Sequence, residues 1–372
     1  MTCRVVHLTS VHYAFDTRIY HRECKSLALA GYDVMLIAPY TDGNQSQNCF
    51  KLKTVKAPSN RCQRFTRTIW AVYQAAVREN ADIYHFHDPE LIPIGVLLKM
   101  KGKRVIYDVH EDYKGTMVGK KWLPWGLHIL ASLAVMVCEK TLSLACDRVV
   151  AATPAIARNF RPAQTRLVQN YPWLYELSSP NSFPYEQRDA IVAYVGWLDD
   201  SRGMREMTQA IELAAKEIPV KLVIGGKVRG GGRSDFENDG PNELVEYLGF
   251  LDRSQVKELI ARSRIGIVTF LSSANHQEAQ PTKLFEYMSG ALPVIASDFP
   301  VYRKIVETAK CGMLVNPRDP SAIAEAIKYL IKNPAQAAEM GRNGQRAIAE
   351  KFNWEREAES LLAMYAELQP DH

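Results

Sequence analysis

The chain has 372 residues, of which 47% are hydrophobic and 23% are charged, and its formal net charge is +5. This length exceeds one ordinary hydrophobic core and suits two domains of globular composition. The mild positive charge permits an anionic ligand or membrane surface, and the absence of any nucleic-acid-binding signature argues against a nucleic acid partner.

Seven cysteines are scattered along the chain without a C-x-x-C pair, which favours reduced thiols in a cytosolic protein. No stretch reaches the roughly 20 apolar residues that a spanning helix needs. Residues 3–8 read as a buried strand and not as a signal peptide. We therefore expect a cytoplasmic protein.

Strands and helices alternate through the first half of the chain. Strands are predicted at residues 3–8, 33–39, 81–87, 103–110 and 147–154, with helices at 21–32, 64–80 and 91–100 and a helical region up to about residue 145. This βαβ rhythm indicates a doubly wound parallel sheet.

Residues 171–189 break the rhythm with three prolines and several polar residues, which is typical of a linker. A second α/β series follows, with strands predicted at 190–196, 220–226, 245–250, 264–270, 292–297 and 312–316, and a last helix at 354–368. The pattern predicts two Rossmann-like halves, with ligands beyond the carboxyl ends of the strands.

The most informative segment contains Glu278 and Glu286, eight positions apart between two predicted buried strands. Thr282 is a plausible N-cap, preceded by Pro281, and the apolar stripe behind it predicts a helix. A helix start leaves backbone N–H groups unpaired at its positive dipole end, so it can hold a phosphate. Glu278 precedes the start of the helix, and Glu286 lies about one helical turn inside it. This arrangement suits the binding of a sugar by one carboxylate and of a ribose by the other.

These residues resemble the E-x7-E signature of the retaining, nucleotide-sugar-dependent glycosyltransferases of family four, which have the GT-B fold. The resemblance extends from SVHYAFDTRIYHRECKSLALAGYDVMLIAP through YDVHEDY and YVGWLDDSRG to FNWEREAESLLAMYAEL. It implies two Rossmann-like domains facing across a cleft, with acceptor binding by residues 1–175, nucleotide-sugar binding by residues 176–353, and a final helix, residues 354–372, crossing back onto the first domain.

On the donor side, the resemblance places the diphosphate at a strand-to-helix turn that contains Gly196, Arg202 and Gly203. Trp197 replaces the family's usual arginine, and Lys283 is a candidate for the second phosphate cation. Glu286 would bind the ribose, Glu278 would approach the transferred sugar, and amides around Thr282 and Leu284 would contact sugar and phosphate. Phe250 and Leu251 would face the base. No D-x-D pair occurs in the chain, which fits a metal-independent reaction in which cations and aligned amides neutralise the leaving phosphate.

On the acceptor side, His110 ends a predicted strand and matches the family's active-site histidine, which can exchange a proton near physiological pH. The loop after the first strand carries His12, Asp16 and Arg18, which could bind acceptor hydroxyls or a phosphate. His87 and Asp88 end another strand at the same edge and are also candidates for binding the acceptor or lining its cleft. His85 and His87 share one face of that strand, but no further cysteine or histidine follows at metal-ligand spacing, so we predict no metal site.

The predicted activity is retaining transfer of a sugar from a nucleotide-diphosphate donor to a glycan or lipid-linked glycan, in capsule, O-antigen or exopolysaccharide synthesis, without a cofactor. Two basic and aromatic segments, residues 61–70 and 120–127, suit peripheral contact with an anionic membrane, although residues 127–146 fit an ordinary half-buried helix equally well. The main alternative function is that of an epimerase with the same fold, which would act on the donor alone and need no acceptor. A nicotinamide oxidoreductase is disfavoured because no G-x-G-x-x-G follows an early strand, and an inactive sugar-nucleotide-binding scaffold is suggested only by Trp197.

Overall fold

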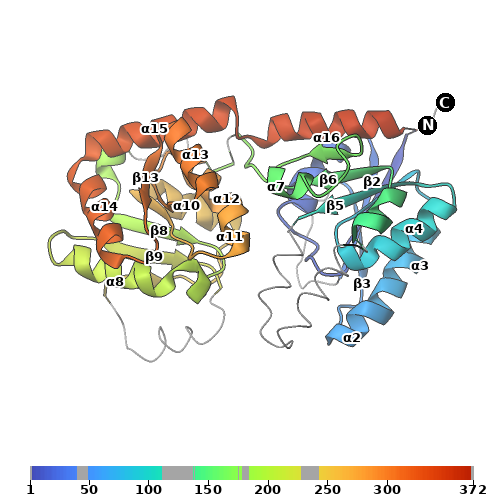
Figure 1. Ribbon diagram of the computed structural model, residues 1–372, viewed down its shortest axis with the longest axis horizontal. Helices are drawn as coiled ribbons and strands as arrows, with labels where there is room; N and C mark the ends of the chain where they lie inside the picture. Colours follow the sequence, from blue (N-terminus) through green and yellow to red (C-terminus); the bar gives the residue numbers. More distant parts are fainter. Residues whose placement is uncertain are drawn as a thin grey trace. The chain divides into compact units, whose positions relative to one another are not determined.

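The computed structural model describes residues 2–39, 49–110, 137, 139–174, 176–177, 184–227 and 243–369. The chain forms two compact units (Figure 1). The first ends at Asn170 and is completed by residues from Arg356 onward, and the second is Tyr171–Glu355. The division at Asn170 lies before the predicted residue 175 because the Tyr171 ring packs against Phe285 and Phe352 of the second unit.

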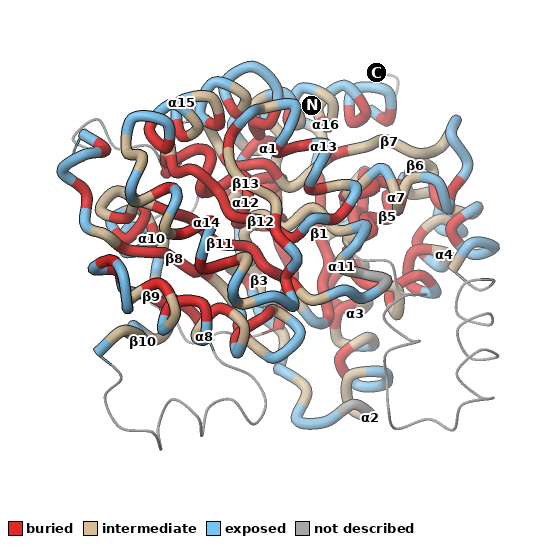
Figure 2. Tube along the Cα trace, turned by 60° about the vertical axis from the view of Figure 1, so that its left-hand side comes forward, coloured by how far each residue is buried: buried red, intermediate tan, exposed pale blue. Residues whose placement is uncertain are grey.

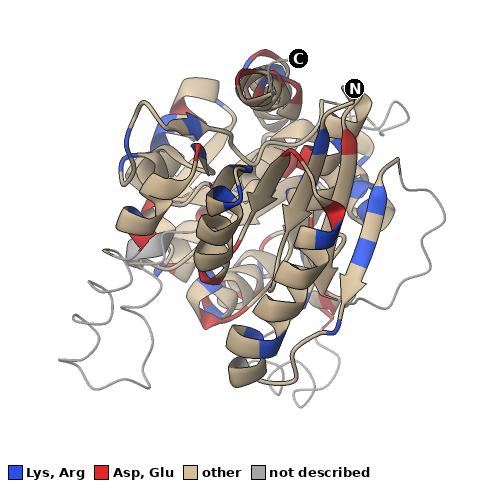
Figure 3. Ribbon diagram, turned by 90° about the vertical axis from the view of Figure 1, so that its right-hand side faces the viewer, with Lys and Arg blue, Asp and Glu red and all other residues tan. Residues whose placement is uncertain are grey.

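The first unit is built on a parallel sheet with the strand order β3-β2-β1-β4-β5-β6-β7. Its strands are β1 (Arg4–Leu8), β2 (Asp33–Pro39), β3 (Lys51–Val55), β4 (Ile83–Phe86), β5 (Arg104–Val109), β6 (Arg148–Ala151) and β7 (Thr165–Leu167). The predicted strands are confirmed, and β3 and β7 are additional. Edge strand β3 carries Lys51 and Lys53, and charged edges of this kind discourage pairing with other chains. Figure 3 shows Lys and Arg in blue and Asp and Glu in red on the helices and strands.

The helical segments of this unit connect successive strands. They are η1 (Ile19–Cys24), α1 (Lys25–Leu29), α2 (Arg61–Gln63), η2 (Arg64–Thr68), α3 (Ile69–Glu79), η3 (Pro89–Leu91), α4 (Ile92–Met100), η4 (Ser143–Ala145) and α7 (Pro154–Ala157). The helix predicted from residue 21 begins earlier, at Ile19, as the π-helical turn η1. Of the predicted helical region before residue 145, residues 111–136 lie outside the described part of the chain.

The last helix, α16 (Trp354–Leu368), has the predicted bounds and returns to the first unit. Tyr365 is fully buried there and contacts His85 through its hydroxyl group. Glu367 forms ion pairs with Arg148 of β6 and Arg166 of β7. The first unit is therefore completed by residues from the far end of the sequence.

The second unit has a parallel sheet with the order β10-β9-β8-β11-β12-β13. Its strands are β8 (Ile191–Val195), β9 (Lys221–Gly225), β10 (Val245–Tyr247), β11 (Ile265–Val268), β12 (Val294–Ser297) and β13 (Gly312–Val315). Its helical segments are η5 (Tyr185–Gln187), η6 (Asp200–Arg202), α8 (Met204–Ala215), α10 (Arg253–Arg262), α11 (Ala274–Glu278), α12 (Thr282–Ser289), α13 (Pro300–Ala309), α14 (Pro320–Lys332) and α15 (Pro334–Glu350).

Both sheets are covered by helices, so their central strands are buried on both faces and read as continuous apolar runs. Every residue of β8, β11 and β12 is buried, and Figure 2 shows the strands as buried stretches surrounded by more exposed helices. In each unit the strand order reverses beside the first strand, β1 or β8. Ligands of open parallel sheets bind at that switch point, beyond the strands' carboxyl ends.

Among the described residues, no helix combines the length and apolar content needed to cross a bilayer.

Candidate active site

The turn that is predicted to hold the diphosphate follows β8 in the second unit. Gly196 follows β8 with a φ of +114°, and Gly203 precedes α8 with a φ of +75°. A Cβ atom at Gly203 would lie 2.2 Å from the carbonyl oxygen of Thr269. Only glycine combines this left-handed backbone with so close an approach. The predicted strand-to-helix turn therefore exists, and its backbone is fixed by two glycines.

Lys283, the second residue of α12, projects into this turn. Its Nζ atom lies 3.6 Å from the ring centroid of Tyr194, and a Cβ atom at Gly196 would be 3.4 Å from it. The residue is only 7% exposed, and within the described part of the chain Nζ has no hydrogen-bond partner. Burial, and then the charge of Arg202, hold the pKa of Lys283 well below its ordinary value. A bound anion would supply the partner that this amine lacks.

Arg202, at the end of η6, lies beside the same site. Its guanidinium carbon is 4.5 Å from the ring centroid of Phe270, and Lys283 Nζ is 5.1 Å from that centroid. Arg202 Nε is buried without a hydrogen-bond partner among the described residues. Two basic groups thus approach one aromatic ring next to the Gly196 turn, as expected for a diphosphate site.

The helix that follows differs from its prediction at the first residue. Pro281 occupies the N-cap position with an extended backbone, and Thr282 is already helical, so the predicted Thr282 N-cap is wrong. No side chain caps this helix start. The amide of Leu284 donates to the Pro281 carbonyl at 3.0 Å, whereas the helix itself does not pair the amides of its first two residues, Thr282 and Lys283.

The two glutamates have different environments. Glu286 is 6% exposed, and its Oε1 atom lies 2.7 Å from Arg253 of α10, which also forms an ion pair with Glu176. Glu278 is exposed and ends α11. Glu286 is therefore a fixed carboxylate that shares the Arg253 guanidinium with Glu176. The sequence analysis missed Arg253 because no local pattern connects it to the E-x7-E segment.

Phe250 and Leu251, the predicted base-facing residues, also differ in exposure. Phe250 is 70% exposed, and Lys227 Nζ lies 5.4 Å from its ring and 5.8 Å from the ring of Trp197. Leu251 packs toward Gly225, where a Cβ atom would be 2.3 Å from its Cδ1. Phe250 and Trp197 are therefore two exposed aromatic side chains close to Lys227, just after β9.

Asp108, in β5 of the first unit, contacts several of the residues predicted to bind the acceptor. Its two carboxylate oxygens accept hydrogen bonds from Arg18 at 2.8 Å each. Its Oδ2 atom also lies 2.8 Å from His110 Nε2 and 3.1 Å from His87 Nδ1. Burial opposes ionisation, but Arg18 and His110 hold the pKa of Asp108 well below its usual range. His110, the predicted catalytic histidine, is thus oriented by a buried carboxylate.

His12 lies at the same edge, with its ring 4.7 Å from that of His110. Its Nδ1 atom is 3.4 Å from Asp16, and its Nε2 atom is 3.6 Å from Asp88. Burial disfavours the charged ring, but the hydrogen bond to Asp16 and the nearby carboxylates outweigh it and raise the pKa of His12 to about 9. Three predicted acceptor residues, His12, Asp16 and Asp88, are therefore grouped with His110.

Arg18 requires a revision of the predicted acceptor contact. Its side chain is 4% exposed, and besides Asp108 its guanidinium donates to the Val168 carbonyl and to Asn170, each at 2.8 Å. These internal partners occupy the guanidinium. We therefore assign Arg18 to holding Asp108 in place and not to contacting an acceptor.

His87 is fully buried and takes part in a second cluster. His7 Nδ1 lies 2.9 Å from His87 Nε2, and Glu23 and His85 complete a group of potential ligand atoms within 4.8 Å of one another. The reasoning that no further histidine joins His85 and His87 is therefore corrected. His7 escaped notice because it lies on another strand, far away in the sequence. The expectation of no bound metal remains a prediction at this point.

Two protein-family models match the chain, one in each half. A family described as "Glycosyl transferases group 1" matches residues 178–347, and one described as "Glycosyltransferase Family 4" matches residues 17–168. The chain belongs to the family-four glycosyltransferases. Its fold is GT-B, with two Rossmann-like units and the returning C-terminal helix.

Among relatives, spore coat protein SA of Bacillus subtilis is 24% identical over 185 residues, which are 47% of this chain and 48% of that protein. The chain thus matches about half the length of this relative. Among solved structures, sucrose-phosphate synthase from Thermosynechococcus elongatus has a TM-score of 0.73 at 20% identity and covers 99% of both chains. HepE from Anabaena, in complex with UDP-glucose, has a TM-score of 0.73 at 14% identity, covering 98% of this chain and 99% of that one.

Proposed function

We propose that this protein is a retaining glycosyltransferase that moves a sugar from a nucleotide-diphosphate donor to a glycan or polyprenyl-linked glycan. The observation that carries the proposal is the buried amine of Lys283, which lacks a hydrogen-bond partner among the described residues and lies beside Gly196 and the uncapped start of α12. A buried ammonium without a counter-charge is costly, so this geometry favours an anionic ligand. Family membership supports a sugar nucleotide as that ligand.

The donor would bind through the second unit. Lys283, Arg202 and the amides of Thr282 and Lys283 would neutralise the diphosphate, while Glu286 would accept hydrogen bonds from the ribose hydroxyls. Glu278 and Leu284 would contact the transferred sugar and its phosphate. Phe250 offers an exposed aromatic face to the base. The solved complex of the related fold HepE contains UDP-glucose, which supports a nucleoside diphosphate sugar as donor.

The chemical step would need little covalent participation by the protein. The bond between the anomeric carbon and the leaving phosphate breaks, and the acceptor oxygen forms a bond on the same face of the sugar. The acceptor's proton passes to a phosphate oxygen. Lys283 and Arg202 would stabilise the charge that develops on the leaving group, so we propose a metal-independent transfer without a cofactor. His110 would contact the donor sugar, while His12, Asp16 and Asp88 would bind acceptor hydroxyls.

The experiment that tests the proposal is a calorimetric screen of nucleoside diphosphates and their sugars. We expect micromolar binding of one nucleotide class, followed by transfer once a glycan or lipid-linked glycan acceptor from capsule, O-antigen or exopolysaccharide synthesis is added. Conversion of the donor alone into an isomeric sugar nucleotide would favour the epimerase instead. Binding of no sugar nucleotide would overturn the proposal.

Replacement of Glu286 by glutamine should weaken donor binding by about 10–100-fold, because a hydrogen bond to a charged group contributes about 1.5–3 kcal/mol. The amide keeps the shape of the side chain, but it loses the charge that faces Arg253. Titration calorimetry with the donor measures the change. Glu307→Gln, at an exposed position of α13, is the matched control and should bind as the wild type does. Unchanged affinity in Glu286→Gln would exclude a ribose contact.

We also propose that the first unit makes peripheral contact with the cytoplasmic face of an anionic membrane. Phe65 and Trp70 are 54% and 55% exposed, and Arg67 between them is exposed as well. Arg64 is less available, because it forms an ion pair with Glu90 at 2.7 Å and lies over the Phe65 ring. The other predicted basic and aromatic segment, residues 120–127, lies outside the described residues.

In flotation with vesicles of anionic lipid at low salt, the wild type should rise with the vesicles, and the double variant Phe65→Ser, Trp70→Ser should lose most of this binding. The aromatic side chains supply apolar area at the interface, while basic side chains add attraction of about 1 kcal/mol each. Tyr329→Ser, at a 41% exposed position of the second unit, is the control. Failure of the wild type to float would remove the membrane from the proposal.

A further inference from the structure

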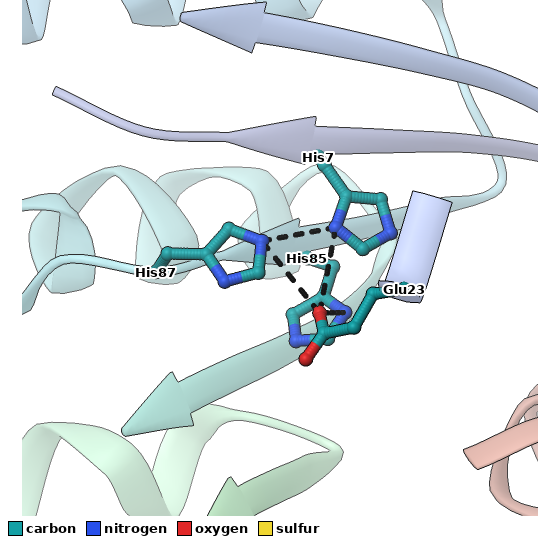
Figure 4. A group of neighbouring side chains, drawn as sticks. All are labelled: His7, Glu23, His85 and His87. Carbon is teal, nitrogen blue, oxygen red and sulfur yellow. Dashed lines mark hydrogen bonds and ion pairs between the residues drawn. The ribbon is translucent and has the colours of Figure 1, made fainter. Parts of the chain in front are cut away.

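Four buried side chains from separate segments converge in the first unit. His7 comes from β1, Glu23 from η1, and His85 and His87 from the end of β4. All four side chains are 0% exposed. His7 and His85 are direct partners in the parallel register of β1 and β4. Figure 4 shows the three imidazole rings directed toward the carboxylate of Glu23.

The distances in this cluster are nearly equal around one oxygen atom. Glu23 Oε2 lies 3.9 Å from His7 Nδ1, 3.9 Å from His85 Nδ1 and 4.0 Å from His87 Nε2. Oε2 makes no hydrogen bond to any residue that the structure describes. Three ring nitrogens therefore surround a buried carboxylate oxygen at separations too long for hydrogen bonds but short enough to share an ion.

Two of the histidines, His7 and His87, also have outer partners of the kind that orient metal ligands. His87 directs Nε2 into the cluster, while its Nδ1 atom lies 3.1 Å from the carboxylate of Asp108. His7 directs Nδ1 inward, and its Nε2 atom is 3.3 Å from the hydroxyl of Tyr365. The same hydroxyl lies 2.8 Å from His85 Nδ1, which is also the nitrogen that faces Glu23, so His85 would have to release this contact to bind an ion through Nδ1. A histidine held by a carboxylate or hydroxyl on its far side is the usual outer arrangement of a zinc site.

Glu23 shares the Arg18 guanidinium with a second buried carboxylate. Glu23 and Asp108 are both 0% exposed, and one guanidinium, that of Arg18, approaches both of them. A buried carboxylate that lacks a counter-charge of its own can take up either a proton or a metal ion.

We propose that His7, Glu23, His85 and His87 form a four-ligand site for a divalent transition-metal ion of the zinc class. Neutral imidazoles and a carboxylate suit such an ion, and a tetrahedron with bonds of about 2.0–2.1 Å has ligand separations of about 3.3 Å. The three oxygen–nitrogen separations would shorten, and the 2.9 Å approach of His7 to His87 would lengthen slightly. Binding would release the proton that Glu23 or the His7–His87 contact otherwise holds.

A second group, His87, Asp108 and His110, is a weaker candidate. Both oxygens of Asp108 already accept hydrogen bonds from Arg18, so an ion there would face a guanidinium. Arg18 also lies 2.9 Å from Glu23 Oε1, but Glu23 Oε2 has no hydrogen-bond partner among the described residues. The proposed ion would tie η1 to β1 and β4 and would lie in a different unit from Lys283. It is therefore compatible with metal-independent chemistry at the donor phosphate, and it replaces the expectation of a metal-free chain.

The test uses the wild-type chain of 372 residues. The protein is dialysed against a chelator, loaded with Co²⁺ or Zn²⁺, freed of excess ion by gel filtration and analysed by elemental mass spectrometry. We expect about one bound ion per chain, and the absorption spectrum of four-coordinate Co²⁺. Retention of less than about one-tenth of an equivalent would overturn the site and leave the cluster as a proton-sharing network.

Variants then locate the ion. Glu23→Gln and His85→Gln should lose the bound Co²⁺ and its four-coordinate spectrum, whereas His276→Gln in the second unit should retain both. Circular dichroism shows whether each variant is folded, and if the buried variants fail to fold, the wild-type stoichiometry and spectrum still decide. Loss of the ion in His110→Gln but not in Glu23→Gln would place it on the other group and refute the proposal, as would a six-coordinate spectrum.

Discussion

Replacement of Lys283 by methionine is expected to lower the rate of sugar transfer by about 10²–10³-fold while the protein stays folded. The lost group is a cation in a site from which water is largely excluded, where it would act on the charge that develops on the leaving phosphate. Initial rates with saturating acceptor, measured for wild type and variant, give the comparison.

The folded protein should tolerate this change because Lys283 is buried and Nζ has no hydrogen-bond partner among the described residues. Methionine has a similar length and no charge, and flexible thioether side chains fill irregular spaces well. The melting temperature should therefore stay the same or rise. A variant that loses activity together with stability would point to a structural role for Lys283.

The pH dependence of nucleotide binding gives a second readout of the same residue. The pKa of Lys283 lies well below its ordinary value in the free protein because of burial and Arg202, and a bound diphosphate would raise it. The complex then holds one more proton than the free protein, so affinity should fall as pH rises between the two pKa values and level off below the lower one. Lys283→Met should abolish this slope, whereas Lys304→Met on the exposed face of α13 should keep it.

Replacement of Asp108 by asparagine is expected to destabilise the first unit by about 3–5 kcal/mol, because it leaves the buried Arg18 guanidinium without its main counter-charge. The amide is nearly the same size as the carboxylate, so the effect would come from charge and hydrogen bonding. Arg18, His87 and His110 all contact Asp108, and transfer should fall as well because His110 loses its orienting partner.

Thermal or denaturant unfolding measures the loss, and Asp33→Asn is the control. Asp33 pairs with Arg4 and Lys51 at the surface, with side-chain exposures of 29%, 45% and 60%. Exposed pairs of this kind contribute about 0–1 kcal/mol. If the two variants lost the same stability, the buried network around Asp108 would not have the importance assigned to it.

The fold could be predicted because its determinants are local. Central strands such as β8 and β11 are buried on both faces, so they appear in the sequence as apolar runs of the right length. Edge strand β3 was missed because none of its residues, KLKTV, is buried, so no apolar run marks it in the sequence. The start of α12 was misplaced by one residue, since a proline followed by a threonine permits either residue at the N-cap.

Site residues could be predicted where they lie at the end of a strand or the start of a helix. They could not be predicted where they depend on contacts between segments far apart in the sequence. Lys283 and Gly196 belong to short motifs at such ends. Arg253, which pairs with Glu286, and His7, which contacts His87, come from segments that only the folded chain brings together. Arg18 illustrates the opposite error: its loop position suggested ligand contact, but Asp108 and Asn170 draw it into the interior.

Tyr365 has a consequence for how the chain acquires its structure during synthesis. This residue of α16 closes over His7 and His85, which lie near the beginning of the sequence. Domains usually form in order as they leave the ribosome. Helix α16 emerges after the other elements of both units, so the buried polar side chains of β1 and β4 are covered late in synthesis. The second unit can therefore finish folding before the first.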